Sequence, residues 1–358
     1  MKRFCLFGIF VVILFTLLNV VCVAESQQEL SIVSKSTLSF AELKELTGGQ
    51  LPSEPVPVDG VPEQYLDGIT PPATWDWRDV RGIDWMTRVK HQGGCGSCAA
   101  FASCGAVEAM MNLWSNDPDL DMDFSEQHLF NCADGECSSG LYMGDAFDYF
   151  TNPGVPDEAC FPYQGIDLDC SETCADWQDR ATKLDSWSLM WQYGTVNDLL
   201  KQAVWWQPIA VYLEVYADFG SYSGGVYKYD GTSPFSGGHF VVIVGWDDSL
   251  QCWICKNSWG EGWGENGYFR IAWDEVYIGS WAMDPDLVEP ACVHDGDVNG
   301  DNMLTAGDAQ LAFQATLGTY QVTGFEACRA DCNGDDLISA SDAQTIFFAV
   351  MGTGTCAE

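Results

Sequence analysis

The stretch Gln92-Gly-Gly-Cys-Gly-Ser-Cys98, followed directly by Ala99-Ala-Phe-Ala102, joins a glycine-rich loop to a run of helix-forming residues. We therefore expect a helix to begin at Cys98. The unpaired amides and the dipole of a helix N-terminus favour a thiolate, which is the reactive form of a cysteine side chain. The preceding glycines let the backbone turn tightly and leave the sulfur open. Cys98 is therefore a candidate nucleophile.

Two candidate partners of Cys98 lie far downstream. His239 precedes the apolar run Phe240-Val-Val-Ile-Val244, which predicts a buried strand that would hold the imidazole rigidly. Asn257 lies in Lys256-Asn-Ser-Trp-Gly260. A nucleophilic cysteine needs an adjacent base, and that base needs a third group to orient it. The three side chains together predict a catalytic triad.

These motifs resemble those of the papain family of cysteine peptidases, and the resemblance runs from Trp75-Asp-Trp-Arg78 to about Gly279. It implies an α+β fold with two lobes, one helical and one like a β-barrel. It also implies an endopeptidase that hydrolyses peptide bonds through an acyl-enzyme on Cys98, without a cofactor for catalysis.

The resemblance assigns further roles around the triad. Gln92 and the backbone N–H of Cys98 would form the oxyanion hole, and Trp259 would cover the hydrogen bond between His239 and Asn257. The expected substrate contacts are the backbone of Ser139 and Gly140 and a pocket lined by Leu141, Tyr142 and Phe240. This pocket would receive the substrate residue two before the cleaved bond and predicts an apolar side chain there.

Two positions depart from the family pattern. Ala99 stands where family members usually carry tryptophan, and Cys137-Ser-Ser-Gly140 replaces the usual Cys-Asn-Gly-Gly. One alternative is therefore a weakened or inactive relative that serves as a binding or scaffold component. Another is a transpeptidase, since acyl transfer uses the same triad.

The ends of the chain differ from its middle. Residues 1–24 combine Lys2 and Arg3 with the apolar run Leu6–Leu18, which is typical of a cleaved signal peptide; a retained anchor is the alternative. A proline-punctuated stretch follows, which indicates a pro-segment or leader, with a plain linker as the alternative. The expected division is 1–24 signal peptide, 25–71 pro-segment or leader, 72–287 peptidase domain and 292–356 tail domain. No stable membrane span is expected after the first segment.

Sixteen cysteines indicate disulfides and an oxidising, extracellular compartment. The family resemblance implies the pairs Cys95–Cys137, Cys132–Cys170 and Cys160–Cys174. Fourteen cysteines follow residue 24, so one besides Cys98 is left over, and we expect Cys104 to be a buried free thiol. The pairing of the others stays open: Cys252, Cys255, Cys292, Cys328, Cys332 and Cys356. Zinc binding is the rival reading of these cysteines, and their irregular spacing disfavours it.

The net charge of the chain disfavours two classes of partner. Lys and Arg number 15 against 52 Asp and Glu, which gives a net charge of −37. Repulsion from phosphates disfavours nucleic acids and anionic membrane surfaces as partners. We expect protein or peptide substrates instead.

A repeat of 34 residues marks the tail. Asp297-Val-Asn-Gly-Asp301 recurs as Asp331-Cys-Asn-Gly-Asp335, and Asp308-Ala-Gln310 recurs as Asp342-Ala-Gln344. Oxygen side chains at loop positions 1, 3, 5, 9 and 12 are a calcium pattern, so two structural calcium ions are expected. The first site would use Asp297, Asn299, Asp301, the Met303 carbonyl, Thr305 and Asp308, and the second Asp331, Asn333, Asp335, the Leu337 carbonyl, Ser339 and Asp342.

Aspartate at position 12 and a single helix after each loop make the tail resemble a dockerin, a small all-α calcium-binding domain. The resemblance implies a cohesin-type scaffold protein as partner and places the enzyme outside the cell, on a scaffold or a cell surface. The alternative is a calcium-stabilised tail without a cohesin partner.

Overall fold

The computed structural model describes residues 51–52, 56–62, 70–192, 194, 196–286, 294–300, 303–335 and 337–356. The predicted signal peptide lies outside these residues, as does most of the predicted pro-segment. Residues 287–293, where the predicted boundary between catalytic body and tail falls, lie outside them too. The chain divides into the units Met1–Glu42 and Leu43–Glu358, and every described residue belongs to the second.

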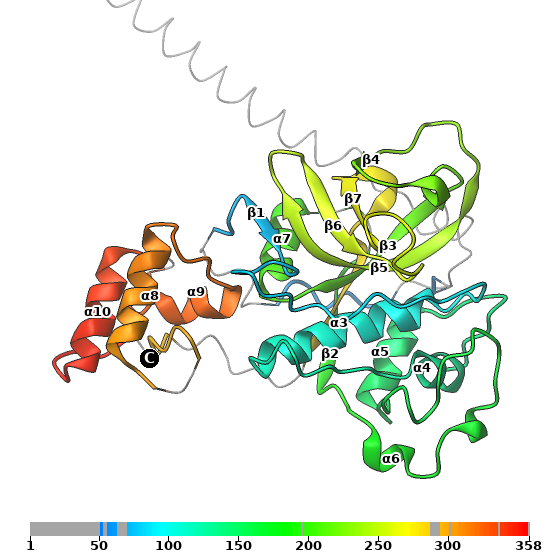
Figure 1. Cartoon of the computed structure of the whole chain (residues 1–358), viewed down its shortest axis with the longest axis horizontal. Helices are drawn as coiled ribbons and strands as arrows, with labels where there is room; N and C mark the ends of the chain where they lie inside the picture. The colour runs from blue at the N-terminus through cyan, green and yellow to red at the C-terminus, as the bar shows by residue number, and fades with distance from the viewer. Residues whose placement is uncertain are drawn as a thin grey trace, which may run out of the picture. The chain divides into compact units, whose positions relative to one another are not determined.

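Within the described part of the chain, eight strands form one sheet (Figure 1). Its order is β2-β8-β3-β5-β6-β7-β4, with β1 paired to β5, and every pair is antiparallel except β4 with β7. The strands are β1 (Thr74–Asp76), β2 (Ser186–Trp191), β3 (Ile209–Tyr216), β4 (Val226–Tyr227), β5 (Phe235–Asp247), β6 (Cys252–Lys256), β7 (Tyr268–Ala272) and β8 (Ser280–Asp286).

The helices of the body lie mainly between β1 and β2 in the chain. They are α3 (Cys98–Trp114), α4 (Glu126–Cys132), α5 (Met143–Thr151), α6 (Trp177–Arg180) and α7 (Asn197–Trp206), with short 3₁₀ turns at η2 (Cys170–Glu172), η3 (Phe219–Ser221) and η4 (Glu275–Tyr277). Helix α3 packs against β5 on one side and against α4 and α5 on the other. Its alanine and glycine residues allow that close approach, so α3 is buried along most of its length. This arrangement confirms the papain-like α+β fold.

Strand β5 is longer than the predicted strand Phe240–Val244. It begins at Phe235 and pairs with β3 along most of its length, so His239 lies inside the strand opposite Leu213. The prediction missed this because Gly237 and Gly238 have low strand propensity. Tertiary pairing overrides that propensity and holds His239 more firmly than a flanking loop would.

The three predicted disulfides of the body are confirmed: Cys95–Cys137, Cys132–Cys170 and Cys160–Cys174. In the tail, Cys332 pairs with Cys356. Four described cysteines are free and buried, namely Cys98, Cys104, Cys252 and Cys255. Cys104 is therefore a free thiol as expected, and β6 adds two more.

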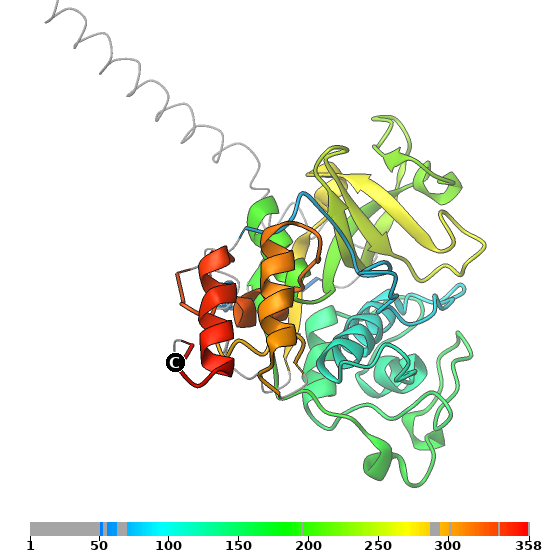
Figure 2. The same ribbon diagram turned by 60° about the vertical axis from the view of Figure 1, so that its left-hand side comes forward.

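The tail contributes three helices among its described residues: α8 (Ala306–Thr316), α9 (Gly324–Ala330) and α10 (Ala340–Val350). Figure 2 shows α8 and α10 side by side, and they pack together around a small core that includes Val298, Ala312 and Ile346. Thr305 and Ser339 cap these two helices in the same way. The sequence repeat is thus a structural repeat.

No helix in the described ranges is long and apolar enough to cross a membrane.

Candidate active site

The candidate nucleophile, Cys98, lies at the start of a helix, as the sequence predicts. Helix α3 begins at Cys98, whose side chain is buried. Two of the preceding glycines are required by the backbone: Gly93 has a φ of +66°, and a Cβ on Gly96 would lie 3.0 Å from the carbonyl oxygen of Cys137. The Cys95–Cys137 disulfide ties the same loop to the helical lobe. The loop is therefore fixed on both sides.

The predicted base and its orienting residue meet across neighbouring segments of the sheet. The Nε2 atom of His239, on β5, lies 2.8 Å from Oδ1 of Asn257, just after β6. Because Nε2 is engaged by Asn257, Nδ1 is the imidazole nitrogen that is available to the sulfur of Cys98. The ring of Trp259 lies 5.0 Å from that of His239, centroid to centroid. The roles predicted for Asn257 and Trp259 fit this geometry, because a bulky indole keeps water from the hydrogen bond.

Burial affects the pKa values of Cys98 and His239 more than the helix terminus does. It raises the pKa of the Cys98 thiol to about 11, although the N–H groups of Cys98, Ala99 and Phe240 act in the opposite direction. Burial also lowers the pKa of His239 to about 4, against the bond to Asn257. Burial of each group thus opposes its charged form, whereas the nearby backbone N–H groups favour the thiolate and Asn257 favours the imidazolium.

Hydrogen bonds fix both the side chain and the backbone of Gln92, the predicted donor to the oxyanion. Its Oε1 accepts a 2.5 Å hydrogen bond from the Ser258 hydroxyl, while Nε2 donates to the carbonyl of Cys95 at 2.9 Å. Its backbone carbonyl accepts from the hydroxyl of Tyr163. With Oε1 anchored, the second hydrogen on Nε2 is available to a substrate oxyanion.

Ser258 orients this amide and offers a test. In Ser258→Ala we expect kcat to fall about 3- to 10-fold with KM nearly unchanged, because a loosened oxyanion donor loses part of the ~10²-fold effect of a fixed one. Steady-state kinetics on a fluorogenic peptide measures the change. Ser103→Ala, which removes a buried hydroxyl elsewhere on α3, is the control and should retain the wild-type kcat. A kcat unaffected by Ser258→Ala would show that Gln92 needs no anchor.

The predicted substrate-backbone residues lie beside the nucleophile loop. A Cβ on Gly96 would lie 3.2 Å from Cα of Gly140. The amide of Gly140, however, donates to the carbonyl of Glu136 at 2.6 Å, and its carbonyl accepts from the amide of Glu136 at 3.3 Å. A substrate strand at Ser139 and Gly140 would therefore have to share or displace these bonds.

The predicted pocket residues lie in an aromatic cluster that sequence motifs did not reveal. Phe240 packs edge-on against Tyr212, and Tyr142 packs edge-on against Trp281, and all four side chains are buried. A Cβ on Gly238, next to the base, would lie 2.6 Å from the ring of Tyr212. Leu141 is buried as well. Tyr212 and Trp281 have no local motif, because only the pairing of β3 with β5 and β8 brings them here.

A buried ionic cluster lies behind the triad. Nζ of Lys90 contacts carboxylate oxygens of Glu108 at 2.8 Å, Asp123 at 2.7 Å and Glu126 at 2.6 Å. Burial is the main cause that raises the pKa of Glu126 to about 8, and its like-charged neighbour Glu108 adds to it. Lys256, which precedes Asn257, bonds to Thr87, whose hydroxyl donates to Glu108. The cluster thus joins the segment just before Gln92 to the end of β6, just before Asn257.

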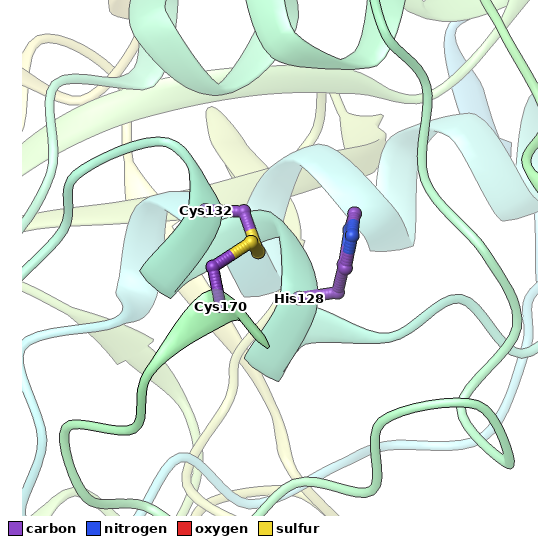
Figure 3. Close-up of side chains that lie close together, drawn as sticks. All are labelled: His128, Cys132 and Cys170. Atoms are coloured by element: carbon purple, nitrogen blue, oxygen red, sulfur yellow. A yellow bond between two sulfur atoms is a disulfide. The ribbon is translucent and has the colours of Figure 1, made fainter. Parts of the chain in front are cut away.

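Another convergence of side chains involves His128, Cys132 and Cys170 (Figure 3). The two sulfurs are bonded to each other, so neither offers the thiolate that zinc requires. His128 is fully buried beside Trp177, and burial lowers its pKa to about 4. The zinc reading of these cysteines is therefore wrong, and His128 is a packing residue.

The second tail loop brings its predicted ligands together. Carboxylate oxygens of Asp331, Asp335 and Asp342 converge within 4.8 Å of one another. Asp342 also accepts from the amides of Asn333 and Ser339. In the first loop Asp308 accepts in the same way from the amides of Asn299 and Thr305, whereas Asp301 lies outside the described residues. The oxygen-rich donor set fits calcium.

Comparisons with known proteins agree with this site. Residues 71–283 match the family described as papain family cysteine protease. Pro-cathepsin H of Mus musculus is 34% identical over 252 residues, which cover 66% of this chain and 70% of that protein. The oryzain gamma chain of Oryza sativa subsp. japonica is 36% identical over 214 residues, 57% of this chain and 56% of that one.

Solved structures are similar too. Procathepsin L2 from the larval midgut of Tenebrio molitor has a TM-score of 0.58 at 32% identity, covering 70% of this chain and 81% of that one. A cysteine protease of Carica candamarcensis in complex with E-64 has a TM-score of 0.51 at 27% identity, covering 61% and 100%.

Proposed function

Since the chain belongs to the papain family of cysteine proteases and is a cysteine-type endopeptidase, we propose that it acts as a secreted enzyme. We propose further that its tail binds calcium and attaches it to an extracellular scaffold. The observation that carries the catalytic part is the 2.8 Å bond between His239 and Asn257 beside the buried N-terminus of α3. The repeated acidic loops carry the part that concerns the tail.

In the proposed reaction Cys98 transfers its proton to His239 and attacks the peptide carbonyl. The oxyanion that forms accepts hydrogen bonds from Nε2 of Gln92 and from the backbone N–H of Cys98. His239 then protonates the leaving amine, which leaves an acyl-enzyme. Finally, His239 takes a proton from water, whose oxygen attacks the thioester carbonyl. The C–S bond breaks, the carboxylic acid product leaves, and His239 returns the proton to the Cys98 sulfur. Asn257 holds the imidazole in position at each stage.

Ala99 bears on the rate of this reaction. Its methyl group is fully buried, so neighbouring side chains fill the place next to the nucleophile. The candidate triad residues and Gln92 are all present, His239 is hydrogen-bonded to Asn257, and Gln92 is anchored by Ser258. We therefore favour an active peptidase over the inactive scaffold component.

Calcium is the proposed ligand of the tail. When bound, it would neutralise the acidic side chains that each loop gathers and would fix the loop against the helix that follows. Asp342 lies at the centre of the second loop, because it is fully buried and also caps α10. Asp308 holds the matching position before α8. Both carboxylates are therefore positioned before the ion arrives.

Isothermal calorimetry on the Cys98→Ala chain tests this proposal. We expect two calcium ions per chain, and one ion in Asp342→Asn, which keeps the shape of the side chain but removes its charge. Asp169→Asn, an exposed cap in the helical lobe, should still bind two ions. No heat of binding at millimolar calcium would refute the proposed loops.

The tail also presents a surface suited to a protein partner. Phe313 on α8 and Leu317, the C-cap of α8, are 47% and 61% exposed. Their repeat equivalents, Phe347 on α10 and its C-cap Met351, are 47% and 62% exposed. Exposed apolar patches of this kind mark interaction sites. They support a cohesin-type scaffold protein as the partner.

Binding to a panel of immobilised cohesin domains tests the partner. We expect calcium-dependent capture that the double variant Phe313→Ala, Phe347→Ala weakens about 10-fold or more, as for hot-spot aromatics. Calcium binding without capture by any domain would favour a tail that is only stabilised by calcium.

A further inference from the structure

Helix α9 of the tail contacts the peptidase body through an ion pair. Nη1 of Arg81, from the body, lies 2.8 Å from both carboxylate oxygens of Glu326 on α9. The same nitrogen donates to the carbonyl of Gln321 at 2.9 Å, and the guanidinium lies over the ring of Tyr320. Both charged side chains are mostly buried. A charge-assisted ion pair that is largely removed from water holds its two side chains in a fixed orientation.

The end of α7 supplies a second contact. Nε1 of Trp205 donates to the carbonyl of Val322 at 3.0 Å. Gly324, the first residue of α9, lies so close to Trp206 that a Cβ there would be 2.7 Å from the indole ring. The contact therefore requires glycine at that position, and the start of α9 packs closely against the body.

The same helix is linked to the start of both acidic loops. Nη1 of Arg329, on α9, donates to the backbone carbonyl of Asp297 at 3.1 Å and lies 3.4 Å from its carboxylate. Asp331, which begins the second loop, is the C-cap of α9. Each loop thus has its first predicted ligand attached to the helix that contacts the body.

A cavity of about 150 Å³ lies at this junction. Trp77, Arg81 and Trp206 line it from the body, and Asn299 and Arg329 line it from the tail. Asn299 is a predicted ligand of the first loop. That loop therefore faces the body directly.

We propose that α9 couples calcium binding in the tail to the stability of the peptidase body. The inference rests on the proposed calcium sites. An ion that binds only the folded loops stabilises them. The stabilisation reaches the body because the C-terminal end of α9 is linked to both loops through Arg329 and Asp331, while α9 also contacts Arg81 and α7. The tail then stabilises the peptidase body in addition to attaching the enzyme to a scaffold.

The test uses the full chain with Cys98→Ala, which prevents self-digestion. Calcium binding is measured by calorimetry, unfolding of the body by scanning calorimetry with calcium or with chelator, and hydrogen exchange is followed across α7. We expect calcium to raise the midpoint of the body transition by about 3 °C or more and to slow exchange in residues 197–206.

Two variants on this background separate coupling from binding. Arg81→Ala and the milder Glu326→Gln should still bind calcium but lose at least half of the shift in midpoint. Arg88→Ala removes a mostly exposed guanidinium that pairs with Asp123 inside the body, and this variant should keep the full shift.

The outcomes are distinguishable. Calcium binding with no shift, or with a shift that both interface variants retain, overturns the coupling and leaves the calcium proposal standing. No calcium binding at all overturns both.

Discussion

Replacing Cys98 with alanine is expected to lower kcat/KM on a peptide substrate by about 10⁴-fold or more and to abolish covalent labelling by E-64. The reason is that no other group can form the acyl-enzyme, and loss of the nucleophile in such triads leaves only the contribution of binding and of the oxyanion hole. Fluorogenic assays with an apolar residue two before the cleaved bond measure the first effect. Mass spectrometry of the intact chain measures the second.

Cys104 provides the matched control. It is a free, buried thiol on the same helix, six residues after Cys98, and no described residue of the triad bonds to it. Cys104→Ala should keep labelling and most of the activity. Equal labelling of wild type and Cys98→Ala, or equal loss in both variants, would contradict the assignment of the nucleophile.

Acid is expected to destabilise the enzyme through its buried histidines. The pKa of His128 falls from 6.5 to about 4 on folding because the ring is buried, so the unfolded chain binds more protons between these values. The free energy of unfolding from this group is fully present above pH 6.5 and is lost as the pH falls toward 4. The difference of 2.5 units corresponds to about 3 kcal/mol.

Urea unfolding of the Cys98→Ala chain between pH 4 and 7 tests this. In the additional variant His128→Gln, the pH dependence should be shallower by up to about 3 kcal/mol, whatever its stability at pH 7. His239 and Glu126 titrate in both proteins, so their contributions cancel. Trp177→Phe changes the packing against His128 without removing the titrating group and should keep the slope. An unchanged slope in His128→Gln would show that another group causes the acid sensitivity.

Local motifs predicted the candidate catalytic residues, because the requirements of that chemistry are local. A nucleophile needs a helix N-terminus, and its base needs a rigid strand; Cys98 and His239 meet these requirements in their own segments. The three disulfides of the body followed from the family resemblance and are confirmed.

What the sequence could not reveal depends on pairing between distant segments. The Ser258 hydroxyl orients Gln92 across 166 positions, and no motif joins them. Tyr212 reaches the base only because β3 lies between β5 and β8. Burial raises the pKa of Cys98 and lowers the pKa of His239, and a helix-terminus argument does not include this effect.

The free thiols of the sheet affect what happens after unfolding. Cys252 and Cys255 are fully buried in β6, and Cys104 is fully buried in α3. Thiol–disulfide exchange requires an accessible thiolate, so the folded chain protects its bridges from its own cysteines. Once the sheet opens at neutral pH, these thiols can attack the four described disulfides and scramble them. The lifetime of the active enzyme is then governed by its rate of unfolding, since a chain with scrambled disulfides does not refold to the native structure.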